Sequence, residues 1–441
     1  MNNSSISIDQ VAQLRIDFLN DKAARLSQNA ITVNPISQVA LDHAIVAAFD
    51  PSVNHRVDYW PVTNQKKSGR CWLFAGLNFL KQHVIEELKV DTFEFSQTYL
   101  HFWDKFEKCN WFLTAMIEMA DRPLDDRTIA TMLAGPNDDG GQWDMFVSLV
   151  EKYGVVPKYA MPETESSSNT AAMNKLLKTF LRRAALELRS AVSTAGDVEA
   201  LRLQFVAQAY RILSIHLGTP PTKFIWQWSD KDRVVHGQGE MTPQEFAKQY
   251  IKVDLADYVA LVHDPRQGSS YGEALTVDHL GNVVGGRATR YINAEIATIK
   301  GLVKQALVDG QAVWFGCDVN QQFDRTNGLW DAAIYDYEGT LGVALDMTKA
   351  ERMESGESAM THAMVFTGVD IQDEQIRRFR VENSWGDDRA DKGFDTMNDS
   401  WFDEYVFEVA LPQSALPAEL AKALTATPRV LPLWDPLGAL A

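Results

Sequence analysis

The sequence predicts an α+β protein, because helical patterns dominate its first half and strand patterns its last third. We divide it into an N-terminal segment with a helical lobe at 1–162, a helical insertion at 163–290 and a β-rich lobe at 291–441. Helices followed by strands, rather than alternating with them, are typical of α+β folds. With 441 residues and 46% hydrophobic content, the chain can build a large core without disulfides or metals.

The first range contains one strongly patterned helix. Apolar residues recur at three- and four-residue steps over residues 71–89, which predicts a helix with a single apolar stripe. A second helix is predicted over residues 143–153, with Gly154 as its C-terminal cap.

The second range is predicted to be largely helical. Periodic apolar residues indicate helices over residues 176–188 and 201–216. Thr242, Pro243 and Glu245 have the pattern of a helix start, with Thr242 as the N-cap and Glu245 completing a capping box.

The third range begins with a helix near residues 295–307 and continues as strands. Short apolar runs bounded by turn residues predict those strands. They cover residues 312–319, 363–369, 378–382 and 401–409.

Charge and cysteine content exclude several classes of function. The net charge is −17, so the surface repels phosphate backbones and no nucleic-acid partner is predicted. Three widely spaced cysteines form neither a disulfide framework nor a metal-binding motif, which suits the reducing cytoplasm and predicts no metal and no cofactor. The N-terminus lacks the pattern of a signal peptide, and no run of 18 apolar residues occurs, so no membrane association is predicted.

Cys71 is the candidate nucleophile. It follows the loop-type sequence NQKKSGR and stands at the start of the first predicted helix. Unpaired N–H groups and the partial positive charge of a helix N-terminus favour a thiolate and lower the pKa of a cysteine. Taken alone, a cysteine in a helix is more often an inert buried thiol than a reactive one. Cys109 and Cys317 have no such surroundings, and we assign them no role.

His362 and Asn383 are the candidate partners of Cys71. His362 stands directly before an apolar strand, and Asn383 ends a strand and begins the sequence Asn-Ser-Trp-Gly. An asparagine amide can accept a hydrogen bond from one imidazole nitrogen and point the other at a thiol. A core histidine and a turn asparagine are the alternatives for each residue alone. The order Gln–Cys, His, Asn-Ser-Trp-Gly favours a cysteine–histidine active site.

These motifs resemble those of the papain-like cysteine peptidases, and more narrowly of the bleomycin hydrolase and aminopeptidase C branch. The resemblance extends over nearly the whole chain. It implies a two-lobed papain-like fold, with a helical lobe and a β-barrel-like lobe, interrupted by a large helical insertion. It also implies that Gln65, six residues before Cys71, supplies the oxyanion hole, and that Trp385 shields the histidine–asparagine hydrogen bond.

The sequence departs from the secreted papain-like signature at two positions. Ser68 stands where that signature has a cysteine, so a disulfide partner is lost, and Arg70 replaces a small residue. The spacing from Cys71 to His362 exceeds the usual one by roughly 140–160 residues, which is about the size of the helical insertion.

Two further features concern the substrate. Gly140 and Gly141 lie in a loop before a predicted helix, where paired glycines let an extended peptide approach the backbone closely. A simple turn is the alternative. In the resembled branch the C-terminal tail lies in the active-site cleft, so Ala441 would hold the α-amine of a peptide with its carboxylate.

We therefore predict a cytoplasmic cysteine aminopeptidase that acts on peptides through a thioester, with Cys71 and His362 as a thiolate–imidazolium pair. The resemblance also implies a homo-hexamer. An endopeptidase or oligopeptidase of the same branch is the nearest alternative, since it would share every catalytic residue. A non-catalytic assembly protein on a protease scaffold is a more distant one.

Overall fold

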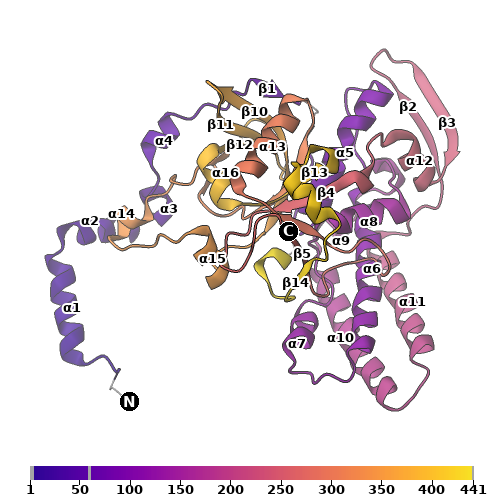
Figure 1. Ribbon diagram of the computed structural model, residues 1–441, viewed down its shortest axis with the longest axis horizontal. Helices are drawn as coiled ribbons and strands as arrows, with labels where there is room; N and C mark the ends of the chain where they lie inside the picture. The colour runs from indigo at the N-terminus through magenta and orange to yellow at the C-terminus, as the bar shows by residue number, and fades with distance from the viewer. Residues whose placement is uncertain (1–3, 58–60, 440–441) are drawn as a thin grey trace.

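The computed structural model describes residues 4–57 and 61–439. Its centre is one large, mixed sheet, with helices gathered mainly on one side of it (Figure 1). The strand order is β14-β5-β6-β4-β13-β7-β10-β11-β12-β9-β8, and β1 pairs with β10 outside this path. The strands are β1 (His55–Arg56), β4 (Tyr258–Val262), β5 (Ala274–Val277), β6 (Tyr291–Asn293), β7 (Val313–Cys317), β8 (Phe323–Asp324), β9 (Leu329–Trp330), β10 (His362–Gln372), β11 (Gln375–Glu382), β12 (Phe394–Asn398), β13 (Val406–Pro412) and β14 (Arg429–Leu431).

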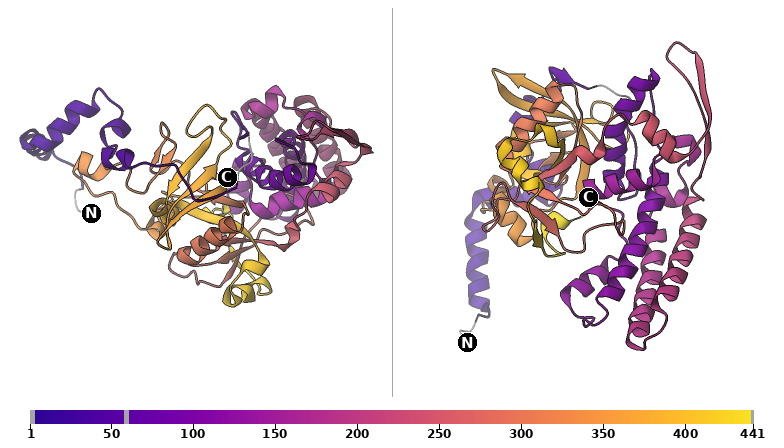
Figure 2. Two further views of the ribbon diagram at one scale, coloured as in Figure 1. Left: turned by 90° about the horizontal axis from the view of Figure 1, so that it is seen from above. Right: turned by 45° about the vertical axis from the view of Figure 1, so that its right-hand side comes forward.

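The helical half packs against the sheet through α5, which contacts β10 and β7. Long helices then extend away from the sheet as a bundle, and a two-stranded hairpin lies at the far edge (Figures 1 and 2). These elements are α5 (Cys71–Leu88), α6 (Gln97–Glu118), α7 (Arg127–Ala134), α8 (Trp143–Tyr153), α9 (Glu165–Ser168), α10 (Ala171–Ser193), α11 (Val198–Leu217), β2 (Phe224–Ser229), β3 (Val235–Met241) and α12 (Pro243–Tyr250).

The sheet separates two hydrophobic clusters because alternate residues of a strand face opposite sides. On β10, Ala363 and Val365 face the cluster shared with the helical half, whereas Met364 and Phe366 face the other cluster. The second cluster is covered by α13 (Ile296–Val308) and α16 (Asp399–Tyr405). The helical half therefore meets β10 on the side that α5 covers.

The N-terminal segment lies apart from both halves. Helices α1 (Ile8–Asn20) and α2 (Lys22–Ile31) project from the body as an arm and have no buried residues (Figure 1). Apolar side chains on α1 are exposed, among them Ile8 at 83%. The remaining short helices are α3 (Ile36–Val39), α4 (His43–Ala47), α14 (Tyr337–Leu341), α15 (Lys349–Ser355) and α17 (Ala418–Ala421).

Most predicted elements are confirmed. The helix predicted over residues 71–89 is α5, the one over 143–153 is α8, and Thr242 caps α12 with the predicted capping box. The sequence predicted burial along one apolar stripe of α5, but nearly every residue of its first three turns is buried.

Two predictions about secondary structure are wrong. Residues 401–409 are not one strand: α16 ends at Tyr405 and β13 starts at Val406. Trp401, Phe402 and Tyr405 have spacings that place them on one face of a helix, and all three are buried there. In addition, the second range is mainly helical only as far as Tyr250, since β4 and β5 join the main sheet.

Candidate active site

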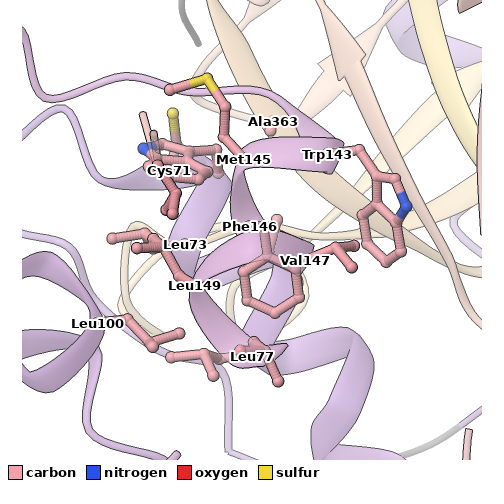
Figure 3. Packing of buried hydrophobic residues seen from close by; sticks show 14 of the residues in the cluster. Cys71, Leu73, Leu77, Leu100, Trp143, Met145, Phe146, Val147, Leu149 and Ala363 are labelled. Atoms are coloured by element: carbon pink, nitrogen blue, oxygen red, sulfur yellow. The ribbon is translucent and has the colours of Figure 1, made fainter. Parts of the chain in front are cut away.

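The candidate nucleophile, Cys71, is the first residue of α5, as the sequence predicted. Arg70 precedes it as the N-cap and makes no side-chain cap. The Cys71 sulfur accepts a hydrogen bond from the Ala363 backbone N–H and lies near the N–H groups of Trp72 and Cys71 itself. In Figure 3 Cys71 lies at the edge of the cluster that packs α5 against α8. The start of α5 thus meets the start of β10, where His362 is the first residue.

The protonation states of Cys71 and His362 differ from the thiolate–imidazolium pair that the sequence predicts. Burial raises the pKa of the Cys71 thiol to about 11, despite the backbone N–H groups that lower it. Burial likewise lowers the pKa of His362 to about 4, despite the hydrogen bond to Asn383. The helix N-terminus alone would have predicted a thiolate, but at a cysteine only 2% exposed the cost of burying a charge is larger. Burial of the site therefore favours a neutral thiol and a neutral imidazole.

His362 and Asn383 are in direct contact. His362 Nε2 and Asn383 Oδ1 are 3.0 Å apart, and Oδ1 also accepts the Ser384 N–H at 2.8 Å. Because Oδ1 is an acceptor, Nε2 carries the proton and Nδ1 is free to accept one. The Trp385 ring lies 5.0 Å from the imidazole, centroid to centroid, and its shielding of the histidine–asparagine hydrogen bond stays a prediction.

Gln65 links the two halves of the site. Its backbone N–H donates to Ser384 O at 2.8 Å, and its side-chain Oε1 accepts from Ser384 Oγ at 2.6 Å. Its Nε2 donates to Ser68 O at 2.6 Å, which leaves one N–H of the amide for a further acceptor. The loop before Cys71 is thereby tied to the residue that follows Asn383.

The start of the range 163–290, which the sequence predicts to be a helical insertion, holds this same loop from the other side. Arg70 is fully buried and pairs with Glu163, with Arg70 NH2 and Glu163 Oε2 2.9 Å apart. Lys67 N–H donates to Ser168 O at 2.9 Å, and Thr170 N–H donates to Lys67 O at 3.3 Å. The first turns of the insertion are therefore part of the support of the site.

Asp139 joins the Gly140–Gly141 loop to the loop before Cys71. Its carboxylate accepts the Gly69 N–H at 3.2 Å and pairs with Lys105, whose Nζ lies 2.6 Å from Oδ1. Burial would raise the pKa of Asp139, but Lys105 and His101 keep it well below the usual range. The carbonyl of Asp139 also accepts the Trp72 Nε1–H at 2.8 Å.

Gly141 is required by packing on Trp72. A Cβ at this position would lie 2.6 Å from the Trp72 indole. The Gly140 carbonyl accepts a hydrogen bond from Lys108 Nζ at 2.5 Å. The structure thus explains Gly141 by close packing, and the contact of Gly140 and Gly141 with a substrate stays a prediction.

The C-terminal tail reaches the same loop. Gln142 Nε2 donates to Ala439 O at 2.6 Å, and Tyr291 OH donates to Leu437 O at 3.1 Å. The end of the described chain lies between the sheet and the helical half (Figures 1 and 2). Ala441, predicted to bind the substrate amine, lies outside the described residues.

A cavity of about 560 Å³ opens on the far side of this loop. Its wall includes Lys108, Gly140 and Met145 from the helical half and Leu433 and Gly438 from the tail. Cys71 and His362 are not among its lining residues.

The residues that support the site are not among those predicted from the sequence. Asp139, Glu163 and Asp395 are buried or nearly buried carboxylates that touch the site loops. Asp395 had a detectable signal, since it is a charge inside the apolar strand Phe-Asp-Thr-Met. Asp139 and Glu163 lie in loops, and no pattern in the sequence places them beside Cys71.

Neither a metal centre nor a membrane span is found in the described ranges. No group of three or more histidine, cysteine, aspartate or glutamate side chains in residues 4–57 and 61–439 could hold a metal ion. Within the same residues no helix is both long and apolar enough to cross a bilayer.

Comparisons with known proteins agree with this geometry. The model of the Peptidase C1-like family matches residues 5–438. Bleomycin hydrolase of Rattus norvegicus is 42% identical over the full length of both chains. Aminopeptidase C of Lactobacillus delbrueckii subsp. lactis is 40% identical, covering 99% of this chain and 98% of its own.

A solved structure is also similar over its full length. The crystal structure of PepW from Lactobacillus rhamnosis superposes with a TM-score of 0.97 at 43% identity, covering 99% of this chain and all of that one. The papain-like fold expected from the motifs is therefore confirmed. The family match and the full-length relatives show that the chain belongs to the Peptidase C1-like family and is a cysteine-type peptidase.

Proposed function

We propose that this protein is a cytoplasmic aminopeptidase that removes N-terminal residues from peptides through an acyl thioester on Cys71. The observation that carries the proposal is the 3.0 Å hydrogen bond between His362 and Asn383. His362 begins β10, and the backbone N–H of the next residue, Ala363, donates to the Cys71 sulfur. An oriented imidazole beside a thiol at a helix N-terminus is the arrangement that cysteine acyl transfer requires.

The proposed reaction starts from the neutral pair. As the Cys71 sulfur attacks the first peptide carbonyl, His362 Nδ1 accepts the thiol proton, and the Nε2 proton keeps its hydrogen bond to Asn383 Oδ1. The free N–H of the Gln65 amide and the Cys71 backbone N–H stabilise the oxyanion. His362 then protonates the leaving amine, and a water molecule, deprotonated by His362, releases the acyl group from the sulfur.

The position of the tail favours an aminopeptidase over an endopeptidase. Ala439, the last described residue, accepts a hydrogen bond from Gln142 in the loop next to the nucleophile, and we propose that the Ala441 carboxylate binds the substrate amine. A terminal carboxylate there would pair with the α-ammonium of a peptide and exclude a longer chain. A relative carries the name aminopeptidase C, which agrees with this role.

The test compares an aminoacyl fluorogenic substrate with its N-acetylated form. We expect the wild type to cleave the free-amine substrate, Cys71→Ala to be inactive, and Cys109→Ala to stay active as the thiol control. Removal of residues 440–441 should raise cleavage of the acetylated substrate relative to the free one. Activity in Cys71→Ala contradicts the nucleophile, and equal cleavage of both substrates by the wild type favours the endopeptidase.

We also propose assembly into a homo-hexamer through the N-terminal arm, α1 and α2, and the helical insertion. The support is the exposed apolar face of α1, where Val11, Leu14 and Phe18 lie at helical spacing and are all exposed in the described part of this subunit. Contiguous exposed apolar surface of this kind marks protein contacts. Sedimentation of the full chain beside a chain lacking residues 1–31 tests it: the hexamer should be lost in the shorter chain.

A further inference from the structure

Asp395 is a buried carboxylate directly behind the candidate histidine–asparagine pair. It lies on β12, where it is opposite Val381 of β11 in the sheet, and β11 ends one residue before Asn383. Asp395 is 1% exposed. A charged group at such a position is costly unless every hydrogen-bonding site is used, so its partners define its role.

Two partners share the Asp395 carboxylate. Its Oδ2 accepts from Asn383 Nδ2 at 3.0 Å and from Arg389 NH1 at 2.9 Å. Its Oδ1 accepts from Arg389 NH2 at 2.7 Å. Arg389 thus holds the carboxylate by a two-point contact, which leaves Oδ2 fixed in front of the Asn383 amide. Burial raises the pKa of Asp395 to about 7 although Arg389 and Asn383 favour the charged form, so raising the pH to 8 favours the carboxylate.

This contact distinguishes the two orientations of the Asn383 amide. In the observed orientation Nδ2 donates to Asp395 and Oδ1 faces His362 Nε2. If the amide turned over, its oxygen would face the carboxylate and its NH₂ would face the imidazole. The repulsion from the carboxylate opposes that state, and so does the Ser384 N–H, which would then face the Asn383 NH₂ instead of Oδ1. The flipped state would favour a proton on His362 Nδ1, the nitrogen that must be free.

We propose that Asp395 is a positioning residue that fixes the Asn383 amide with its oxygen toward His362 and thereby selects the Nε2–H tautomer of the catalytic imidazole. Asp395 touches neither substrate nor sulfur and acts through Asn383 and His362. The inference rests on the proposed roles of these two residues. A purely structural ion pair between Asp395 and Arg389 would affect stability and leave the histidine tautomer unchanged.

The decisive experiment exchanges the two polar groups and measures kcat/KM at pH 8. Asn383→Asp puts two carboxylates in contact, and Asp395→Asn removes the charge that orders the amide, so each single change should lower kcat/KM by about 100-fold. The double variant restores one carboxylate and one amide in contact, with the new carboxylate at position 383 accepting from His362. We expect its kcat/KM to exceed that of Asn383→Asp by at least about tenfold, because contacting residues are not additive.

The pH profile gives a second reading of the same variants. A carboxylate beside His362 raises its pKa, so the acid limb of kcat/KM in the double variant should lie at higher pH than in the wild type. If the fold-losses in kcat/KM of the two single variants multiply in the double variant, the proposal is contradicted. An Asp395→Asn enzyme with the wild-type kcat/KM and pH profile also contradicts it. If Asp395→Asn does not fold, the comparison of the double variant with Asn383→Asp decides.

The chain contains a matched control on the same strand. Asn398 Nδ2 donates to Asp331 Oδ2 at 2.8 Å, an asparagine–aspartate contact that does not involve His362. Asp331→Asn should keep the wild-type kcat/KM and pH profile. The Cys71→Ala variant distinguishes a failure of the proposed function from a failure of the inference about Asp395. Activity in that variant refutes the proposed function. If the enzyme depends on Cys71 but the kcat/KM losses of the two single variants multiply in the double variant, only the role of Asp395 is refuted.

Discussion

The two sides of the candidate site are held in different ways. On the nucleophile side, charged groups from the helical half bind backbone and guanidinium groups of the loop before Cys71. On the imidazole side, a neutral amide contacts His362, and the charges of Asp395 and Arg389 lie one step further back. The first side must fix the direction of backbone N–H groups, whereas the second must fix a tautomer without charging the imidazole.

Neither side uses a covalent link. Cys71, Cys109 and Cys317 are all free. Ser68 stands where the secreted signature has a cysteine, and its hydroxyl donates to Gln65 O at 2.7 Å instead. Asp139 and Glu163 supply the contacts that hold the loop. Buried ionic contacts therefore take the structural place of a disulfide on the nucleophile side.

The largest effect is expected for Asp139→Asn, which removes a buried carboxylate from the nucleophile side of the site. It leaves the buried Lys105 ammonium without its carboxylate, which should lower the free energy of unfolding by about 3–5 kcal/mol. Chemical denaturation measures this. Asp138→Asn, in the same loop, is the control, because the Asp138 carboxylate is half exposed and should cost under about 1 kcal/mol. Equal losses in the two variants would contradict the assignment.

Gln65→Ala tests the link between the two sides. It removes an oxyanion donor and the contact with Ser384 Oγ, so kcat should fall by about 10²–10³-fold. Gln65→Glu keeps the acceptor for Ser384 but removes the donor, so it should lose nearly as much. If Gln65→Glu were as active as the wild type, the contact with Ser384 would matter and the oxyanion role would not.

Glu163→Gln weakens the nucleophile side in a pH-dependent way. Burial would raise the pKa of Glu163, but the charge and hydrogen bonds of Arg70 outweigh it and lower the pKa to about 2. The carboxylate therefore stabilises the fold fully above about pH 4.5, its unfolded pKa, and this stabilisation is lost as the pH falls through about 2.

The expected loss in Glu163→Gln is on the order of 2–3 kcal/mol at pH 7. The difference from the wild type should shrink as the pH falls below about 4.5. Urea unfolding at pH 7, 4 and 3 measures it. A difference that is constant with pH would mean that Glu163 acts by packing and not by its charge.

The smallest effect is expected for Gln142→Leu, which loosens the tail. Loss of one hydrogen bond to Ala439 should cost about 1 kcal/mol and reduce the preference for free-amine over acetylated substrates by a few-fold. The kcat/KM ratio of the two substrates is the measurement. An unchanged ratio would show that Gln142 does not position the tail.

The sequence predicted the fold class, most helices and a set of candidate site residues, of which His362, Asn383, Gln65 and Cys71 lie on segments that meet in the structure. Cys71, His362, Asn383 and Gln65 could be found because each stands at the end of a strongly patterned element or at a fixed spacing from one. Asp139, Glu163 and Arg389 could not, because their roles depend on contacts between segments 70–93 residues apart or on a loop geometry without a pattern. The ionisation of Cys71 was missed for a related reason, since burial appears only in three dimensions.

Labelling with an epoxide thiol inhibitor tests the central claim most directly. After reaction of the full-length wild type, peptide mapping by mass spectrometry identifies the modified cysteine. We predict one label, on Cys71, formed in step with the loss of aminopeptidase activity and absent from Cys71→Ala. Full activity with Cys71 labelled, or inactivation with the label only on Cys109 or Cys317, would contradict the account.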